Sequence, residues 1–329
     1  MATVTIHDSR LTALESWLSR ELGAAPRLEP VSSDASFRRY FRLISPDSAS
    51  LIAMDAPPEH EDTAQFLAVA RLMRGADVHV PEVKAATPDA GFALLSDLGT
   101  QTYLDAINEG DADALITDAL NALVRWQSAT RPGALPPYDD IVLHRELALF
   151  PDWYVERHLG RRFTPDQRRV WERVCAALVS QAQAQPQVYV HRDFILRNLM
   201  VADPNPGVID FQDALVGPIA YDVLTLFRDA FHRFDPDFIE QGIAHYLELA
   251  RAAGLPVPTD DEFRRWFDLI GVQRHLKVAG IFARLAHRDS KPKYLAEIPR
   301  FLGYLRETAP HYPETEALIP LLDALEDGT

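Results

Sequence analysis

Apolar residues near the start of the chain recur every three to four positions, as on one face of a helix. This spacing predicts an amphipathic helix over 11–22, with Ser9 or Thr12 as its N-cap and Gly23 at its end. The polar face carries glutamates and no basic cluster, so we expect the helix to pack on a domain and not on a membrane. Its apolar positions are Leu11, Leu14, Trp17, Leu18 and Leu22.

Up to Gly99 the chain is dominated by short apolar and alternating runs, which are typical of strands. One helix interrupts them, predicted over 63–74. Strands are predicted over 27–31, 37–43, 50–55, 78–83 and 92–95.

Beyond Gly99 the apolar spacing is almost wholly helical. The change predicts an α+β fold of two lobes, a β-rich N-terminal lobe over 1–98 and a helical C-terminal lobe over 99–329. The predicted helices are 103–107, 111–127, 144–158, 165–184, 219–231, 237–253, 260–286, 296–308 and 315–325.

One polar loop interrupts this helical region. A short β-rich segment, 187–190, leads into His191-Arg192-Asp193, and Asn198 follows the aspartate five positions later. The order H-R-D-x-x-x-x-N is the catalytic-loop pattern of kinases. Taken alone, the tripeptide is also compatible with a surface turn.

A hairpin is predicted directly after this loop. The runs 199–201 and 208–211 have strand character, and the intervening 203–207 is rich in turn-forming residues. The second strand carries Asp210, which the hairpin is expected to return to the neighbourhood of the loop.

These residue types suit phosphoryl transfer from ATP, which needs a positioned acceptor hydroxyl and cations over the phosphate oxygens. We expect Asp193 to orient and deprotonate the acceptor. The amide oxygen of Asn198 and the carboxylate of Asp210 are hard ligands of the kind that Mg²⁺ prefers.

The amino-acid composition limits the kinds of molecule that the chain is expected to bind. The 329 residues are 47% hydrophobic and carry a formal net charge of −15, which argues against nucleic acid or an anionic membrane as a general partner. The single cysteine, Cys175, is expected to be a core residue. No signal-like N-terminus and no membrane-length apolar run is present, so we expect a cytoplasmic protein.

The chain resembles the aminoglycoside phosphotransferase-like branch of the protein-kinase-like fold. The resemblance rests on Leu95-Ser96-Asp97-Leu98-Gly99, the loop of Asp193, Ile209-Asp210-Phe211, and Gly217 to Asp222. It implies a hinge in which backbone groups of Leu95 to Asp97 pair with adenine. Asp222 is expected to brace backbone amides and not to take part in chemistry.

A closer resemblance is to the anomeric sugar kinases of bacterial cell-wall recycling. It rests on the strings at 36–42, 53–59, 145–154 and 271–285. It implies ATP-dependent phosphorylation of N-acetylmuramate or N-acetylglucosamine at the anomeric hydroxyl, with a sugar 1-phosphate as product. The partner it implies is thus a small amino sugar; the oligomeric state stays open.

The phosphate-binding side departs from the kinase pattern. Met54 stands where the third strand of kinases carries a lysine. We hypothesise that one of Arg38, Arg39 or Arg42 supplies the missing charge, with Lys84 as a weaker candidate. Solvated surface arginines are the alternative.

The loop expected to cover the nucleotide, at 32–36, also departs from the kinase pattern, because it lacks glycine. Ser33, Asp34 and Ser36 offer backbone amides and hydroxyls to phosphates, although a plain hairpin turn explains the segment equally well.

The acceptor pocket is expected beside Asp193. Candidate sugar contacts are Glu146, Asp152 and Trp153, with buried structural roles as the alternative. Arg274 or His275 is hypothesised to meet a substrate anion such as the lactyl carboxylate of N-acetylmuramate, the alternative being a solvated helix face.

Two rivals remain at this point. The first is a kinase of the same fold acting on choline, homoserine, an aminoglycoside or a protein. Arg192 and Ile195-Leu196-Arg197 replace residues usual in the aminoglycoside branch, which weakens the case for antibiotics. The second is a non-catalytic nucleotide-binding module, which Met54 favours and the intact Asp193, Asn198 and Asp210 oppose.

Overall fold

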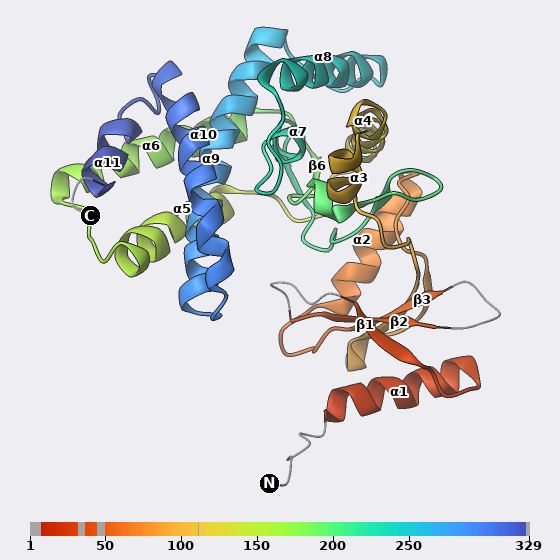
Figure 1. The fold of residues 1–329 in the computed structure, drawn as a ribbon. Helices are drawn as coiled ribbons and strands as arrows, with labels where there is room; N and C mark the ends of the chain where they lie inside the picture. Colours follow the sequence, from red (N-terminus) through yellow and green to blue (C-terminus); the bar gives the residue numbers. More distant parts are fainter. Residues whose placement is uncertain (1–7, 32–36, 45–49, 111, 327–329) are drawn as a thin grey trace, which may run out of the picture. The chain divides into compact units, whose positions relative to one another are not determined.

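A computed structural model of the chain combines an antiparallel sheet with a larger set of helices, as expected for an α+β kinase-like fold (Figure 1). Among the described residues, every helix is too short or too polar to cross a bilayer. The structure describes residues 8–31, 37–44, 50–110 and 112–326.

The chain forms two compact units, each described here by itself. The first contains Met1–Gln101 and Met200–Gln212, and the second contains Thr102–Leu199 and Asp213–Thr329. The chain therefore leaves the first unit close to the expected boundary at 98/99, and the hairpin that carries Asp210 returns to it.

The first unit is built on a five-stranded antiparallel sheet in the order β1-β2-β3-β5-β4. The predicted strand over 78–83 is wrong: the strand begins only at Val83. Pro81 has no N–H to give to a ladder, which disfavours pairing of that segment. The elements are α1 (Ser9–Leu22), β1 (Leu28–Val31), β2 (Arg39–Leu43), β3 (Leu51–Asp55), α2 (Thr63–Gly75), β4 (Val83–Thr87), η1 (Pro88–Ala90) and β5 (Phe92–Ser96).

The N-cap of α1 lies one residue before the first expected cap, Ser9, and four before the second, Thr12. The carboxylate of Asp8 accepts a hydrogen bond from the Leu11 amide at 3.0 Å, so Asp8 and not Ser9 or Thr12 is the N-cap. Gly23 ends the helix as predicted, with φ 72°.

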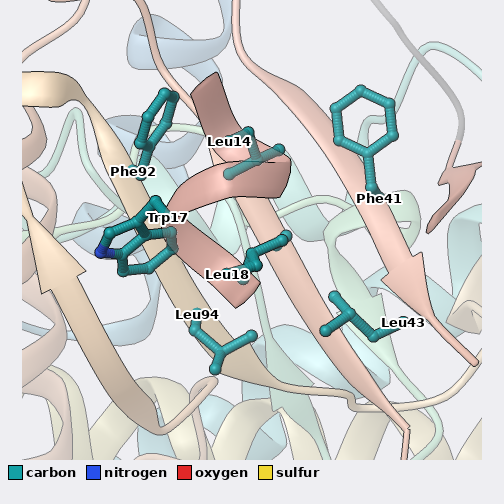
Figure 2. Close-up of a cluster of buried hydrophobic side chains, with 8 residues drawn as sticks. Leu14, Trp17, Leu18, Phe41, Leu43, Phe92 and Leu94 are labelled. Atoms are coloured by element: carbon teal, nitrogen blue, oxygen red, sulfur yellow. The ribbon is translucent and has the colours of Figure 1, made fainter. Parts of the chain in front are cut away.

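The apolar face of α1 packs on the sheet (Figure 2). Because side chains alternate along a strand, the β2 residues Phe41 and Leu43 point to α1, whereas Tyr40 and Arg42 lie on the opposite face. Figure 1 shows α2 on that opposite side. The buried cluster consists of Leu14, Trp17, Leu18, Phe41, Leu43, Ala53, Phe92 and Leu94.

The predicted hairpin after the catalytic loop is confirmed, with short strands β7 (Leu199–Met200) and β8 (Gly207–Val208). The Val208 amide donates to the His79 carbonyl at 2.7 Å, and Phe211 stacks on Phe66 of α2 with ring centroids 4.9 Å apart. These contacts fix the residues around Asp210 within the first unit.

The second unit is mainly helical and contains a two-stranded sheet, β6 with β9. Its longest helix, α9, is buried on most sides and contacts α6, α7, α10 and η2. Cys175 is buried on α6, as predicted. The elements are α3 (Tyr103–Glu109), α4 (Ala112–Ser128), α5 (Asp140–Leu147), η2 (Phe150–His158), α6 (Pro165–Ala184), β6 (Gln187–Val190), η3 (Leu196–Asn198), β9 (Leu215–Pro218), α7 (Tyr221–Phe227), α8 (Pro236–Ala252), α9 (Asp260–His287), η4 (Pro292–Glu297), α10 (Ile298–Thr308), η5 (Ala309–His311) and α11 (Leu318–Glu326).

The single helix predicted over 144–158 is in fact two elements. Helix α5 ends at Leu147, and a π-helical segment, η2, begins at Phe150. Pro151, which has no N–H, lies in the first turn of η2. Gly280 of α9 is needed here, because a Cβ at that position would lie 2.5 Å from the Leu149 carbonyl oxygen.

Candidate active site

The loop that carries Asp193 is held by a buried carboxylate. Asp222, in the first turn of α7, accepts hydrogen bonds from the amides of His191 at 2.6 Å and Arg192 at 2.9 Å. Burial raises the pKa of Asp222 to about 6, although His191 and the two amides act in the opposite direction. These contacts give Asp222 the bracing geometry expected from the sequence, and Arg192 takes a left-handed φ of 76° in this turn.

Asp193 and Asn198 lie within one loop of the second unit. The side chain of Asp193 is 51% exposed, whereas Asn198 is buried. The Asn198 side-chain nitrogen donates to the Asp193 carbonyl at 2.9 Å, which orients the amide with its nitrogen toward the loop backbone. The loop therefore presents a carboxylate to solvent and holds an amide beneath it.

Arg192 belongs to a buried charged cluster behind the loop. Its guanidinium pairs with Glu146 of α5, which also contacts Lys277 of α9 at 2.9 Å and accepts a hydrogen bond from the Tyr138 hydroxyl. Burial alone would raise the pKa of Glu146, but the charges of Lys277 and Arg192 outweigh it and lower the value to about 2. Glu146 is thus the shared anion of this cluster, and its expected contact with a sugar stays a prediction.

The other expected acceptor contacts differ in their surroundings. Asp152 is exposed and Trp153 half-buried on η2. His275 is fully buried and stacks on Tyr304 with ring centroids 4.9 Å apart, and burial lowers its pKa well below the ordinary value. His275 is therefore sealed from any ligand in this conformation.

Arg274, the neighbour of His275 on α9, has a different partner. It is 4% exposed, and its Nη2 lies 3.9 Å from the Asp193 Oδ1. The structure thus separates two adjacent residues that the sequence left as alternatives.

In the first unit, Arg38 forms an ion pair of 2.6 Å with Glu61, directly before the N-cap of α2. Tyr40 lies close to this pair and to Asp210: burial raises its pKa, the charges of Asp210 and Glu61 add to the rise, and Arg38 opposes it. Met54 of β3 is fully buried.

Arg39 and Arg42 have carboxylate partners of their own. Arg39 pairs with Asp55 at 2.5 Å and with Asp8, on the α1 side of the sheet. Arg42 donates to Asp97 at 2.6 and 3.0 Å and braces the segment after β5.

The other residues expected near the nucleotide differ in their exposure. Lys84 is exposed and pairs with Glu82 at 2.6 Å. Leu95 is buried in β5. Ser33, Asp34 and Ser36 lie outside the described residues.

Asp210 follows β8 with a left-handed φ of 64° and is exposed. Gln212 donates to its Oδ1 at 2.8 Å. Within the described part of the chain, no three His, Cys, Asp or Glu side chains gather as a metal-binding group.

Sequence reasoning did not identify Glu61, Tyr138 or Gln273 as site residues. Gln273 donates to Glu146 at 3.3 Å. A signal existed only for Glu61, an acidic residue at the entrance of the helix that follows the third strand, where kinases carry the partner of their lysine.

The fold is shared with solved phosphotransferases. The ADP-bound aminoglycoside phosphotransferase APH(2'')-Ib matches with a TM-score of 0.61 and 15% identity, over 90% of this chain and 97% of that one. A choline/ethanolamine kinase family protein from Mesorhizobium loti matches with a TM-score of 0.63 and 16% identity, over 97% of this chain and 100% of that one. At such identities the likeness concerns the fold.

Sequence relatives are much nearer. The chain is 48% identical over 334 residues to the N-acetylmuramate/N-acetylglucosamine kinase of Pseudomonas putida (strain KT2440) and 49% identical over 333 residues to the Pseudomonas aeruginosa (strain PAO1) kinase of the same name, with 98% of each chain covered in both cases. The model of the phosphotransferase enzyme family matches residues 27–257, well over half of the chain. The chain therefore belongs to the phosphotransferase enzyme family.

Proposed function

We propose that this chain is an ATP-dependent kinase that phosphorylates the anomeric hydroxyl of N-acetylmuramate and N-acetylglucosamine in peptidoglycan recycling, in the cytoplasm. The observation that carries the proposal is the 48–49% identity, over nearly the full length, to kinases named for these two sugars. The choice of the anomeric hydroxyl comes from the resemblance of the strings at 36–42, 53–59, 145–154 and 271–285 to the anomeric sugar kinases.

Asp193 is the proposed base. Its half-exposed carboxylate can accept a hydrogen bond from the sugar hydroxyl, orient it and take its proton as the phosphoryl group arrives. The Asp222 carboxylate and the Asn198 amide hold the backbone on which Asp193 stands. Preorganisation of this loop means that little rearrangement is needed when substrate binds.

Asn198 and Asp210 are the proposed Mg²⁺ ligands. The donor set suits the ion, since an amide oxygen and a carboxylate are hard oxygen ligands. Asn198 turns its nitrogen toward the Asp193 carbonyl, and its oxygen is therefore directed elsewhere. Bound there, Mg²⁺ would neutralise charge on the phosphate oxygens.

ATP is proposed to lie against the first unit. The Leu95 to Asp97 backbone is the candidate adenine contact, and the Ser33, Asp34 and Ser36 loop the candidate phosphate cover. Of the three arginines, Arg38 is the proposed phosphate ligand, because its partner Glu61 stands directly before the N-cap of α2, near where kinases carry the glutamate that pairs with their lysine. Arg39 and Arg42 pair instead with Asp55 and Asp97.

The direct test is ADP release, measured by a coupled assay over a panel of N-acetylmuramate, N-acetylglucosamine, choline, homoserine and an aminoglycoside. Turnover of the two amino sugars alone is expected. The product should lose its phosphate in mild acid, as anomeric phosphates do, and ³¹P NMR should place phosphorus on the anomeric oxygen. Turnover of choline or an aminoglycoside alone, or a 6-phosphate product, would exclude the proposal.

A further inference from the structure

Arg274 combines burial with closeness to the proposed base. It is 4% exposed on the central helix α9, and its Nη2 lies 3.9 Å from the Asp193 Oδ1. At this separation the two groups attract each other without a direct hydrogen bond, since such bonds span about 2.7–3.2 Å. A ligand oxygen that lies to one side of the line joining these two atoms could be within hydrogen-bond distance of both.

The guanidinium also carries an unused donor. Its Nη1 is buried and has no hydrogen-bond partner among the described residues. An unpaired buried donor costs roughly 1–3 kcal/mol, and more when it is charged. The charge itself is balanced, because the buried carboxylate of Asp229 lies near enough to interact with Arg274. The arginine is therefore held in place electrostatically while one donor lacks an acceptor.

Other polar side chains on this stretch of α9 are used inside the protein. Gln273 and Lys277 both contact Glu146, and His275 packs against Tyr304. Of these four described residues, Arg274 is the one with an ion-pair distance below 4 Å to the Asp193 carboxylate, whereas Lys277 senses that charge but pairs with Glu146. This contrast assigns Arg274 to the reaction and its neighbours to the support of the fold.

We infer that Arg274 donates hydrogen bonds to the phosphoryl group during its transfer, an inference that rests on the proposed function. An acceptor oxygen hydrogen-bonded to Asp193 lies about 2.7 Å from that carboxylate. The phosphorus that bonds to this oxygen brings its own oxygens within reach of the guanidinium. Arg274 is thus a catalytic arginine supplied by the chain itself, as in other phosphoryl transfers where an arginine faces the developing charge.

In the balanced step, the sugar oxygen forms a bond to the γ-phosphorus of ATP. The bond between that phosphorus and the β–γ bridging oxygen breaks, the hydroxyl proton passes to Asp193, and ADP leaves. Arg274 stays protonated throughout and stabilises charge on the phosphoryl oxygens. Such an arginine lowers the barrier without changing which sugar binds.

The earlier hypothesis, in which Arg274 binds the lactyl carboxylate of N-acetylmuramate, makes a different prediction. N-acetylglucosamine has no carboxylate, so loss of a carboxylate ligand would raise the KM for N-acetylmuramate alone. Loss of a phosphoryl ligand would lower kcat on both sugars. The two roles are therefore separable with one variant and two substrates.

The experiment compares the wild type with Arg274→Met, Arg274→Gln and Arg274→Lys on both sugars, with Arg284→Met on the same helix as a matched control. We expect kcat to fall about 10²–10³-fold on both sugars in the Met and Gln variants, with sugar KM nearly unchanged and partial recovery in the Lys variant. Unfolding midpoints establish whether the variants are folded. If the Met and Gln variants are not, the kcat of the Lys variant on both sugars tests the inference.

An unchanged kcat, or a defect confined to the KM for N-acetylmuramate, would overturn the inference. If the wild type turns over neither sugar, the proposed function fails, and hydrolysis of ATP by water decides the role of Arg274. A slower hydrolysis in Arg274→Met then supports contact with the phosphoryl group, and an equal rate refutes it.

Discussion

Arg38 and Glu61 form an ion pair of 2.6 Å in which the side chains are only 9% and 13% exposed. The pair lies in the unit whose third strand carries Met54 in place of the usual lysine. A kinase lysine pairs with both a glutamate and the ATP phosphates. The geometry points to Arg38 and Glu61 as the replacement for that lysine and its glutamate, with the cation moved to the residue directly before β2.

Replacement of Arg38 by methionine should therefore weaken ATP binding. A charge-assisted hydrogen bond contributes about 1.5–3 kcal/mol, so we expect the KM for ATP to rise about 10–100-fold. Steady-state kinetics with saturating sugar measure this. Arg39→Met is the matched control and should lower stability while leaving the KM for ATP nearly unchanged, because Arg39 contacts Asp8 and Asp55. Equal effects in the two variants would rule out the assignment.

Asp193→Asn should remove the base while keeping the loop shape. The isosteric amide cannot accept the hydroxyl proton, and we expect kcat to fall about 10²–10⁴-fold. ADP binding, measured by calorimetry, should stay close to that of the wild type. A variant that keeps most of its turnover would show that the proton leaves by another route.

The low pKa of Glu146 predicts a pH-dependent contribution to stability. The value falls from 4.5 to about 2 on folding, so the ionised form is favoured by the folded state. The stabilisation is present above about pH 4.5 and is lost as the pH falls toward 2. Between pH 5 and pH 3, the free energy of unfolding of the wild type should drop by about 2 kcal/mol more than that of Glu146→Gln.

Urea unfolding at several pH values measures this difference. Glu172→Gln, at an exposed position of α6, is the matched control and should follow the wild type. Parallel curves for the wild type and Glu146→Gln would mean that Lys277 and Arg192 do not stabilise the carboxylate.

The contact of α1 with the sheet should contribute to stability without affecting chemistry. Leu14 is fully buried in that interface. Its replacement by alanine should cost about 2–5 kcal/mol of unfolding free energy through lost contacts and the cavity left behind. Thermal unfolding measures the loss, and kcat below the transition should match the wild type. A lower kcat in the folded variant would link α1 to the site.

Local signals predicted much of the fold. The turn-forming residues between β7 and β8 specify their hairpin, and apolar spacing marked helices such as α6 and α8 to within a residue or two. Other features depend on tertiary contacts and could not be predicted from local sequence. Asp8, which also pairs with Arg39, is the N-cap of α1. The segment around Pro151 is π-helical where it packs on α9.

In the candidate site, too, local features could be predicted and long-range pairings could not. The spacing of Asp193 and Asn198 was readable because both stand in one loop. The pairing of Glu146 with Lys277 could not be predicted, because more than a hundred residues separate them and neither local sequence indicates its partner. The choice among Arg38, Arg39 and Arg42 depended on which carboxylate each one meets, a property of the folded chain.

The partnership of Arg192 with Glu146 bears on regulation. In many protein kinases, flexible activation segments become ordered when an added phosphate meets arginine side chains. Here the chain itself supplies a counter-anion, Glu146, for the arginine beside Asp193, the proposed base. We therefore expect that this loop needs no added phosphate to become ordered, so that turnover would follow the supply of sugar and nucleotide.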